Sequence, residues 1–406
     1  MNRMNCRLCT RSDLISIIPL GRVPLANAFS SKKITTNEKK HNLEVMLCKD
    51  CGVAQLRNVL DPKDLFSHYI YFSSYSDTML LSAKILVDRF APSLVKNAFV
   101  IEVGSNDGYL LKNYKRYGIH VLGIDPARNI TKKSCAIGIP TLCNFFNKNL
   151  AKDLKNKKMQ ADIIHANNVM AHVPDINDFV AGLKLLLKNT GYAIIEVPYL
   201  YDLVKNLQFD TIYHEHVYYF SVKPLKQLFT YYDLEIFDIE RISIHGGSLR
   251  IFVGHKGKKI VKEIVNDLVQ KEIKFGLYEA STYQTFMGNV NVIKLNLISF
   301  LNDLKEKQKR IAAYGASAKG TTLLNFFGIG ENTLDFIVDR NLEKQGLFTP
   351  GTSLEIKLPE ALLEKKIDYA LLLTWNFMDE ILHQQKKFRD IGGQFIIPLP
   401  NIRAIA

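Results

Sequence analysis

The sequence has no long hydrophobic run. Nowhere in its 406 residues do about 18 apolar residues stand together, so no membrane-spanning helix and no membrane partner are expected. The first residues, MNRMNCRLCTR, also lack the apolar core of a signal peptide, and we therefore expect a cytoplasmic protein. Hydrophobic residues still make up 47% of the chain, which is enough to build more than one domain core.

Cysteine is scarce as well. Six cysteines are too few for a disulfide scaffold in a chain of this length. Four of them form two CxxC pairs, Cys6/Cys9 and Cys48/Cys51. Each pair can bind one side of a tetrahedral Zn²⁺, so we predict a structural zinc site in residues 1–65; a redox pair or a chance pattern are the alternatives. The remaining two, Cys135 and Cys143, have apolar neighbours and are predicted to be core thiols.

The formal net charge is +13, which raises the question of a nucleic-acid partner. The basic residues are scattered in short pieces such as KNKK, KKIVKE and KEKQKR. The chain has no long basic tail and no RNA-binding motif with interleaved aromatic residues. We therefore expect no nucleic-acid partner and interpret the charge as a Lys-rich surface that suits anionic small molecules.

Strand and helix patterns alternate along most of the chain, which predicts an α/β fold. The strand patterns AFVIEVG, IHVLGID, ADIIHANNV and GYAIIEVPY predict a central α/β domain with a parallel sheet within 66–200. A second run, from RIAAYG through LDFIVDR and DYALLLTW to GQFIIPLP, predicts a second, smaller parallel sheet in a C-terminal domain at 301–406. Residues 201–300 are expected to connect the two and to carry part of the active site. Ligands of such sheets bind at the carboxyl ends of the strands.

The segment EVGSNDG, from Glu102 to Gly108, lies where the first of these strands turns into a helix. Its glycines let the backbone approach a ligand, and Asp125 ends the next strand, where a carboxylate can accept hydrogen bonds from ribose hydroxyls. A nicotinamide cofactor would usually show GxGxxG, whereas an acid before GSNDG and the polar loop HANNV suit S-adenosylmethionine (SAM) better. A purely structural turn is the alternative. The predicted cofactor-binding residues are Glu102, Gly104, Ser105, Asn106, Asp107, Gly108, Asp125, Asn167, Asn168 and Val169.

Two further glycine turns have polar side chains. GASAKG at 315–320 follows a strand and opens a helix, but it lacks the middle glycine of the dinucleotide fingerprint and the length of a P-loop. It could hold a diphosphate or be a structural turn. HGGSLR at 245–250 is equally ambiguous alone. The candidate substrate-binding side chains on these turns are Ser317, Lys319, His245 and Arg250.

The stretch YHEHVYYFS at 213–221 sets two histidines around a glutamate. His214 and His216 are two residues apart, whereas a zincin needs a spacing of four on a helix, and no third histidine supports a metal site. Histidine titrates near neutrality and a neighbouring carboxylate or phenol can orient it, so acid–base chemistry is favoured over a simple polar strand edge. The spacing does not choose between the two histidines.

Taken together, these motifs resemble those of the nucleotide-sugar C-methyltransferases, which methylate a ring carbon of keto-deoxysugars. The resemblance covers essentially the whole chain. It rests on the paired CxxC motifs, LGRVPLAN, YIYFSSYS, EVGSNDG, VPYLYDL, FDTIYHEHVYYFS, HGGSLR, GASAKG and LLTWN. It implies an N-terminal zinc-binding domain, a SAM-binding Rossmann-like middle domain, and a C-terminal Rossmann-like domain that contributes to the nucleotide-sugar cleft.

The resemblance also implies roles for single residues. His216 would be the general base, with Tyr213, Glu215 and one tyrosine of 69–75, taken here as Tyr71, in the same pocket. His214 is kept as a substrate-binding candidate.

The function predicted from the sequence is SAM-dependent C-methylation next to the ketone of a nucleotide-activated keto-deoxysugar, through an enolate formed by histidine. The enzyme would act as a monomer or homodimer. The alternatives are a SAM-dependent methyltransferase of RNA or another substrate, a nicotinamide-dependent sugar oxidoreductase that uses the C-terminal sheet, and a non-catalytic binding module. The nucleotide, the sugar and the ring carbon are not specified by the sequence.

Overall fold

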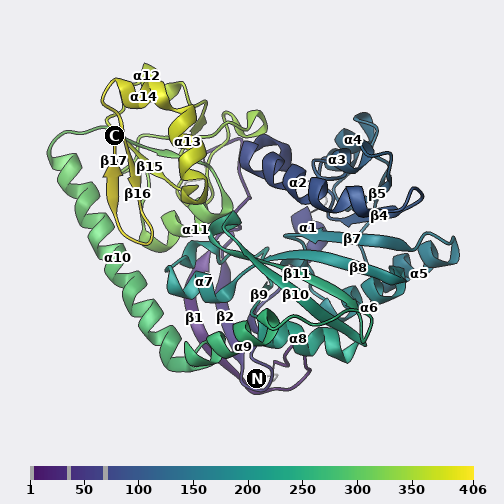
Figure 1. Ribbon diagram of the computed structural model, residues 1–406. Coiled ribbons are helices and arrows are strands. Elements are labelled where there is room, and N and C mark those ends of the chain that lie inside the picture. The colour runs from purple at the N-terminus through teal and green to yellow at the C-terminus, as the bar shows by residue number, and fades with distance from the viewer. Residues whose placement is uncertain (1–3, 34–37, 67–71) are drawn as a thin grey trace.

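The computed structural model describes residues 4–33, 38–66 and 72–406. Within these ranges the chain forms three sheets, of four, seven and six strands (Figure 1). This is the α/β fold with three parts that the sequence predicts. Among the described residues, no helix combines the length and the apolar composition needed to cross a membrane.

The N-terminal sheet includes a strand from far along the chain. Its order is β1-β2-β3-β9, with β1 Leu14–Val23, β2 His41–Cys48, β3 Ala54–Leu56 and β9 Tyr218–Tyr219. All neighbouring strands in it are antiparallel. In the β3–β9 pair, Ala54 lies opposite Tyr219 and Gln55 lies opposite Tyr218. The end of YHEHVYYFS is therefore built into the sheet of the zinc module, by which we mean residues 4–66.

The middle sheet has the order β10-β11-β8-β7-β4-β5-β6. Its strands are β4 Phe99–Val103, β5 His120–Asp125, β6 Thr141–Cys143, β7 Ala161–Asn167, β8 Leu187–Pro198, β10 Leu234–Ile242 and β11 Ser248–His255. The five strands from β8 to β6 are parallel, and the hairpin β10–β11 adds to β8 in antiparallel fashion. The segment 201–300 thus contributes two strands to this sheet.

Short helices accompany these strands. They are α1 Pro62–Phe66, α2 Asp77–Phe90, α3 Leu111–Lys115, α4 Arg128–Ala136, α5 Lys148–Asn156, α6 Ile176–Leu186, α7 Leu200–Lys205 and α8 Val222–Tyr231. Strand β4 reads FVIEV and is buried along four of its five residues, as expected for a parallel strand covered on both faces.

The C-terminal sheet has the order β14-β13-β12-β15-β16-β17. Its strands are β12 Ile311–Tyr314, β13 Ile337–Val338, β14 Ile356–Lys357, β15 Tyr369–Leu372, β16 Gln394–Ile397 and β17 Arg403–Ile405. Only β17 runs antiparallel to its neighbour among these described strands. The helices are α11 Ala318–Phe327, α12 Ala361–Glu364, α13 Met378–Gln384 and α14 Lys386–Asp390.

A long helix, α10 Ala280–Glu306, leads into this domain after α9 Ile264–Lys274. It runs along one side of the molecule in Figure 1. Its buried residues recur every three or four positions: Tyr283, Phe286, Val290, Ile293, Leu297, Leu301 and Leu304. This spacing gives one apolar stripe, which packs on the protein while the other faces meet solvent.

Hydrogen bonds connect α11, the first helix of the C-terminal sheet's domain, to the other two parts of the chain. The hydroxyl of Thr321 donates to the carbonyl of Ala26 at 2.9 Å, and that of Thr322 donates to the carbonyl of Ile212 at 3.0 Å. Both threonines are buried. The first turns of α11 are therefore fixed against the zinc module and the segment that leads into YHEHVYYFS.

Cys135 and Cys143 are exposed, so the prediction that they are core thiols is wrong. Cys135 lies near the end of α4, and Cys143 ends β6, the edge strand of the middle sheet, on which no residue is fully buried. Apolar neighbours in the sequence do not put a residue in the protein core when it lies on an edge strand such as β6, which pairs on one side only.

Candidate active site and metal site

The four cysteines of the CxxC pairs meet at one point. Their sulfur atoms lie within 4.8 Å of one another, with Cys6 Sγ 3.7 Å from Cys51 Sγ and Cys9 Sγ 3.6 Å from Cys48 Sγ. Four thiolates at about 2.3 Å from a tetrahedral zinc ion are about 3.8 Å apart, so this cluster has the right size for zinc. No other histidine, cysteine or carboxylate of the described residues joins it, as expected for a structural site.

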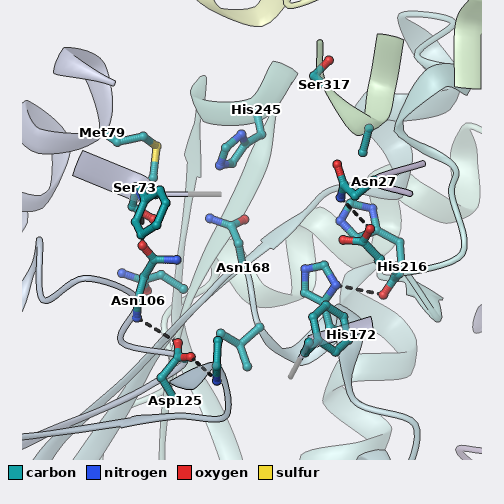
Figure 2. A pocket seen from close by; sticks show the side chains of 18 of the residues that line it. Asn27, Ser73, Met79, Asn106, Asp125, Asn168, His172, His216, His245 and Ser317 are labelled. Atoms are coloured by element: carbon teal, nitrogen blue, oxygen red, sulfur yellow. Dashed lines mark hydrogen bonds between the residues drawn. The ribbon is translucent and has the colours of Figure 1, made fainter. Parts of the chain in front are cut away.

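The main cavity lies where the three parts of the chain meet and has a volume of about 680 Å³. Twelve of the predicted site residues line it: Gly104, Asn106, Asp125, Asn167, Asn168, Val169, Tyr213, Glu215, His216, His245, Ser317 and Lys319. Figure 2 shows Asn106 and Asp125 on one side of this cavity and His172 and His216 on the other. Tyr71 lies outside the described residues.

The turn after β4 can only be made by glycine. Gly104 has a φ of 65°, and its N–H donates to the carbonyl of Ile124 at 2.7 Å. A Cβ at this position would lie 2.2 Å from a methyl carbon of Val169, which comes from the loop after β7. Any side chain at position 104 would therefore collide with the loop that forms the next wall of the cavity.

The carboxylate of Asp125 is held by two backbone N–H groups. Oδ2 accepts from Asn106 at 3.0 Å and Oδ1 accepts from Ala127 at 2.9 Å (Figure 2). Burial raises the pKa of Asp125 to about 6 despite these two bonds. Since each carboxylate oxygen has two acceptor sites, Asp125 can still accept hydrogen bonds from a ligand.

Two asparagines at the end of β7, the last residue of the strand and the one after it, present unused acceptors. The Oδ1 atoms of Asn167 and Asn168 are buried and have no hydrogen-bond partner among the described residues, and both side chains line the cavity. A buried acceptor without a partner is costly unless a ligand or water supplies a donor. Together with the Gly104 turn and Asp125, these amides fit a ligand with hydroxyl and amino groups, such as SAM.

Four predicted cofactor-binding residues do not line the cavity: Glu102, Ser105, Asp107 and Gly108. Glu102 is fully buried, and neither carboxylate oxygen has a hydrogen-bond partner among the described residues. Burial, aided by the charges of Asp107 and Asp125, raises its pKa well above 4.5. Asp107 accepts from the N–H of Ser74 at 3.3 Å, which links the turn to the segment before α2.

His216 is held by two hydrogen bonds that fix its tautomer. Nδ1 lies 2.9 Å from the carbonyl oxygen of Thr211, and Nε2 lies 2.8 Å from the hydroxyl of Tyr213. Because a carbonyl can only accept, Nδ1 carries the proton and Nε2 of the neutral ring accepts from Tyr213. Burial and the neighbouring His172 lower the pKa of His216 well below its usual 6.5, which keeps Nε2 available as a base.

His172 and Asn27, which are not among the predicted site residues, also belong to this centre. The ring of His172 lies 4.8 Å from that of His216, and its Nδ1 donates to the carbonyl of Glu215 at 2.8 Å. Asn27 donates from Nδ2 to Oε1 of Glu215 at 2.6 Å. His172 follows the HANNV loop at the carboxyl edge of the sheet, and Asn27 is the last residue of LGRVPLAN. Their places beside or within these motifs were the sequence signal that could have identified them as site residues.

His214 lies apart from the cavity. Its ring packs edge-on against that of His41 at 5.7 Å, and burial lowers its pKa to about 4. Residues 213–217 are not a strand and include a turn at 214–215; Tyr218 and Tyr219 form β9, and Phe220 makes a single bridge to Tyr199. The two histidines therefore separate, and only His216 faces the site.

The GASAKG turn at 315–320, in the C-terminal domain, places a lysine at the cavity. Lys319 Nζ donates to the carbonyl of His245 at 3.2 Å and lies 4.6 Å from the centre of the Trp375 ring. Burial lowers its pKa to about 8, while Asp210 acts in the opposite direction. Asp210 is itself buried and accepts from Trp375 Nε1 at 2.7 Å. This part of the cavity therefore suits an anionic ligand.

Arg250 does not line the cavity. Its Nε donates to Glu196 at 2.7 Å and its Nη1 to Glu240 at 3.1 Å, which crosslinks β11 with β8 and β10. Both carboxylates keep the guanidinium inside the sheet. Its neighbour in the motif, His245, does line the cavity, and burial lowers its pKa to about 3.

Three family models match consecutive parts of the chain: a zinc binding domain over residues 6–66, a methyltransferase domain over 79–239 and a C-methyltransferase C-terminal domain over 243–400. The chain is 33% identical over 405 residues to the C-methyltransferase NovU of Streptomyces niveus, and this match covers 99% of the chain and 96% of NovU.

Other similarities are narrower. A ubiquinone biosynthesis O-methyltransferase of Bartonella quintana is 29% identical over 101 residues, which is 25% of this chain and 41% of that protein. The solved magnesium protoporphyrin IX methyltransferase of Synechocystis PCC 6803, with bound SAM, superposes with a TM-score of 0.33 and 12% identity. That superposition covers 45% of this chain and 79% of the other.

Replacing Cys48 by alanine should release the metal. The purified protein is expected to contain one zinc ion per chain, and Cys48→Ala to lose it, because three thiolates leave the site open. Metal analysis and the melting temperature check this. The exposed Cys135→Ala is the matched control and should keep both zinc and melting temperature. A Cys48→Ala variant with full zinc content would contradict the assignment.

Gly104→Ala should weaken the binding of S-adenosylhomocysteine, measured by calorimetry, by at least about tenfold. The added methyl group meets Val169 at 2.2 Å. Gly118→Ala is the control, because Gly118 has a similar φ of 71° but no atom within 4 Å of the added Cβ. It should carry the same backbone strain and bind normally. Equal affinities of the two variants would refute a cofactor turn at Gly104.

Proposed function

This chain belongs to the C-methyltransferases, and from that premise we propose that it methylates a ring carbon next to the ketone of a nucleotide-activated keto-deoxysugar, with SAM as the methyl donor. One observation carries the proposal: a neutral His216 shares its cavity with the Gly104 turn and with Lys319. A base, a cofactor turn and a site for an anionic substrate thus face the same space.

The chemistry begins with removal of a proton. A C–H bond beside a ketone is acidic enough to be broken when a base is close and the resulting enolate is stabilised. Nε2 of His216 takes the proton, while Nδ1–H stays bonded to the carbonyl of Thr211 and prevents the ring from rotating. The hydroxyl of Tyr213 holds Nε2 in place until the substrate arrives.

The residues around His216 fix the orientation of the substrate. Glu215, held by Asn27, offers an acceptor for a sugar hydroxyl, and Lys319 supplies positive charge for the anionic nucleotide sugar. SAM supplies a methyl group on a sulfonium, which needs no further activation. The remaining work of the chain is to align the two ligands and to exclude water, and such positioning is worth about 7–11 kcal/mol at best.

Deuterium exchange tests this proposal. In D₂O, with nucleotide 4-keto-deoxysugars (dTDP, GDP and CDP forms) and without SAM, the enzyme should incorporate deuterium at one carbon next to the ketone. Addition of SAM should convert that substrate to a methylated product. His216→Asn should lose at least about a hundredfold in both rates, as expected when a general base is removed.

His214→Asn is the matched control. His214 is close to His216 in the sequence but lies outside the cavity, so this variant should exchange deuterium as fast as the wild type. Unchanged affinity for S-adenosylhomocysteine would show that the His216→Asn variant is folded. The proposal fails if none of the keto-sugars exchanges or gains a methyl group, or if His216→Asn exchanges as fast as the wild type.

The pH dependence of exchange follows from the two shifted pKa values. His216 must be neutral, and its pKa lies well below 6.5, so kcat/KM should fall only at pH values well below 6.5. Lys319 must be protonated, and its pKa of about 8 predicts a second fall above pH 8. Lys319→Arg should remove the alkaline fall, because an arginine stays charged. An acid limb centred at or above pH 6.5 would contradict the environment described for His216.

A further inference from the structure

The groups beside the base are hydrogen-bond acceptors. Nε2 of His216 carries no proton, because the proton of the neutral ring is on Nδ1 and bonded to the carbonyl of Thr211. His172 has the same tautomer, since its Nδ1 donates to the carbonyl of Glu215 at 2.8 Å, and Oε1 of Glu215 accepts from Asn27. Removal of the proton next to the ketone, however, places negative charge on the ketone oxygen, where a donor is needed.

Two donors near the base already have acceptors. The hydroxyl of Tyr213 donates to Nε2 of His216 at 2.8 Å. Nζ of Lys319 donates to the carbonyl of His245 at 3.2 Å and lies 3.4 Å from Oδ1 of Asn376. In the proposed function this lysine also serves the anionic part of the substrate. The donor for the ketone oxygen therefore has to be sought on another wall of the cavity.

His245 lines the cavity from the turn Ile244–Gly246, which joins β10 to β11. In Figure 2 its ring points into the space that separates Asn106 from His216. The carbonyl of His245 accepts from Lys319, but neither nitrogen of its ring makes a hydrogen bond within the part of the chain that the structure describes. A neutral imidazole always carries one N–H, so this ring has a donor available to a ligand.

The turn that carries this ring is closely packed. His245 has a positive φ of 57°, which is uncommon for a residue with a side chain. A Cβ on Gly246 would lie 2.6 Å from a ring carbon of Trp375, and a Cβ on Gly247 would lie 2.7 Å from Cβ of Asp202. The two glycines thus let other parts of the chain pack against the turn. The imidazole is held in place before a substrate binds, as a preorganised donor requires.

The charge state of His245 suits a donor that keeps its proton. Burial lowers its pKa to about 3, and the charge of Lys319 acts in the same direction, so the ring is neutral at neutral pH. Burial is also the main cause of the lowered pKa of His216, but His172, Lys319 and His245 contribute, which places His245 within electrostatic range of the base. Neutral imidazoles with a lowered pKa polarise substrate carbonyls in other enzymes.

We propose that His245 donates a hydrogen bond from its ring to the ketone oxygen of the substrate and stabilises the enolate that His216 generates. This rests on the proposed function and deepens it, because it names the group that stabilises the charge. His245 is then a catalytic residue, and the two histidines act on the same ketone from different walls of the cavity.

The step needs no further reactant. Nε2 of His216 takes the proton of the C–H bond, whose electron pair forms a C=C bond while the π electrons of the ketone move to its oxygen. The N–H of His245 stays intact and hydrogen-bonds to that oxygen. When the carbon bonds to the methyl group of SAM, the C=O bond is restored, and the electron pair of the broken methyl–sulfur bond stays on sulfur.

Deuterium exchange by variants of His245 tests this assignment on the full-length zinc-loaded protein. The probe is the nucleotide keto-sugar that the wild type exchanges in D₂O without SAM. His245→Gly removes the imidazole and His245→Asn shortens the side chain, and both residues tolerate the positive φ at this position. In both variants, kcat for exchange should fall at least about a hundredfold, as expected when one donor to an oxyanion is lost.

The change in kcat and KM separates an enolate donor from a side chain that only binds the substrate. An enolate donor acts in the transition state, so kcat should fall while KM stays nearly unchanged; a binding role alone would raise KM and leave kcat as it is. Unchanged affinity for S-adenosylhomocysteine, measured by calorimetry, would show that the variants are folded. His120→Asn is the matched control, because His120 is exposed at the start of β5 outside the cavity and should change none of these values.

Exchange at the wild-type kcat in His245→Gly and His245→Asn would overturn the assignment, and so would a raised KM with an unchanged kcat. If the wild type exchanges and methylates a nucleotide keto-sugar in that case, the proposed function stands without this donor. If the wild type neither exchanges nor methylates any nucleotide keto-sugar, the proposed function fails, and the assignment of His245 fails with it.

Discussion

The pairing of β3 with β9 is the contact on which the site depends. It joins two segments more than 160 residues apart and makes Tyr218 and Tyr219 part of the sheet of the zinc module. The N–H of Val217 donates to the carbonyl of Ala171 in the middle domain, and the carbonyl of Val217 accepts from Leu56 in the zinc module. One short segment thus holds the walls of the cavity together and carries His216. The cysteine cluster is connected to this segment through the same sheet, since Cys48 ends β2 and β2 pairs with β3.

Burial sets the electrostatic state of the site. Desolvation lowers the pKa of His165 and His245 to about 3 and that of His172 to about 4, and it lowers that of His216 as well. These imidazoles are therefore neutral in the folded protein at neutral pH. Below pH 6.5 an unfolded chain binds protons that the folded chain does not, so burial of these histidines lowers the stability of the folded state there and has no such effect above that pH. The same desolvation thus keeps His216 a free base below pH 6.5 and lowers the stability of the folded state in that pH range.

Local patterns predicted much of the site, and long-range contacts determined the rest. The CxxC spacing, the glycine turns and Asp125 could be found because each depends on a few adjacent residues with a defined conformation. The choice of His216 over His214 required the resemblance, because the alternation of a strand does not apply to residues 213–217, which are not a strand. Arg250, a substrate-binding candidate from the sequence, lies away from the cavity because its two carboxylate partners come from neighbouring strands, which a local pattern does not reveal. Asn27 and His172 were missed because the fold alone brings them to Glu215.

The late position of β9 has a consequence for the growing polypeptide. Until residue 219 has been synthesised, β3 is an edge strand with free backbone donors and acceptors, and such edges invite pairing with other chains. Strand β3 has only three residues, which limits that hazard. The hydrogen bonds from Thr321 and Thr322 come later still, so the zinc cluster can form early while the cavity closes only near the end of translation. A growing chain that already contains all four cysteines could therefore bind its metal before the residues that close the cavity have been synthesised.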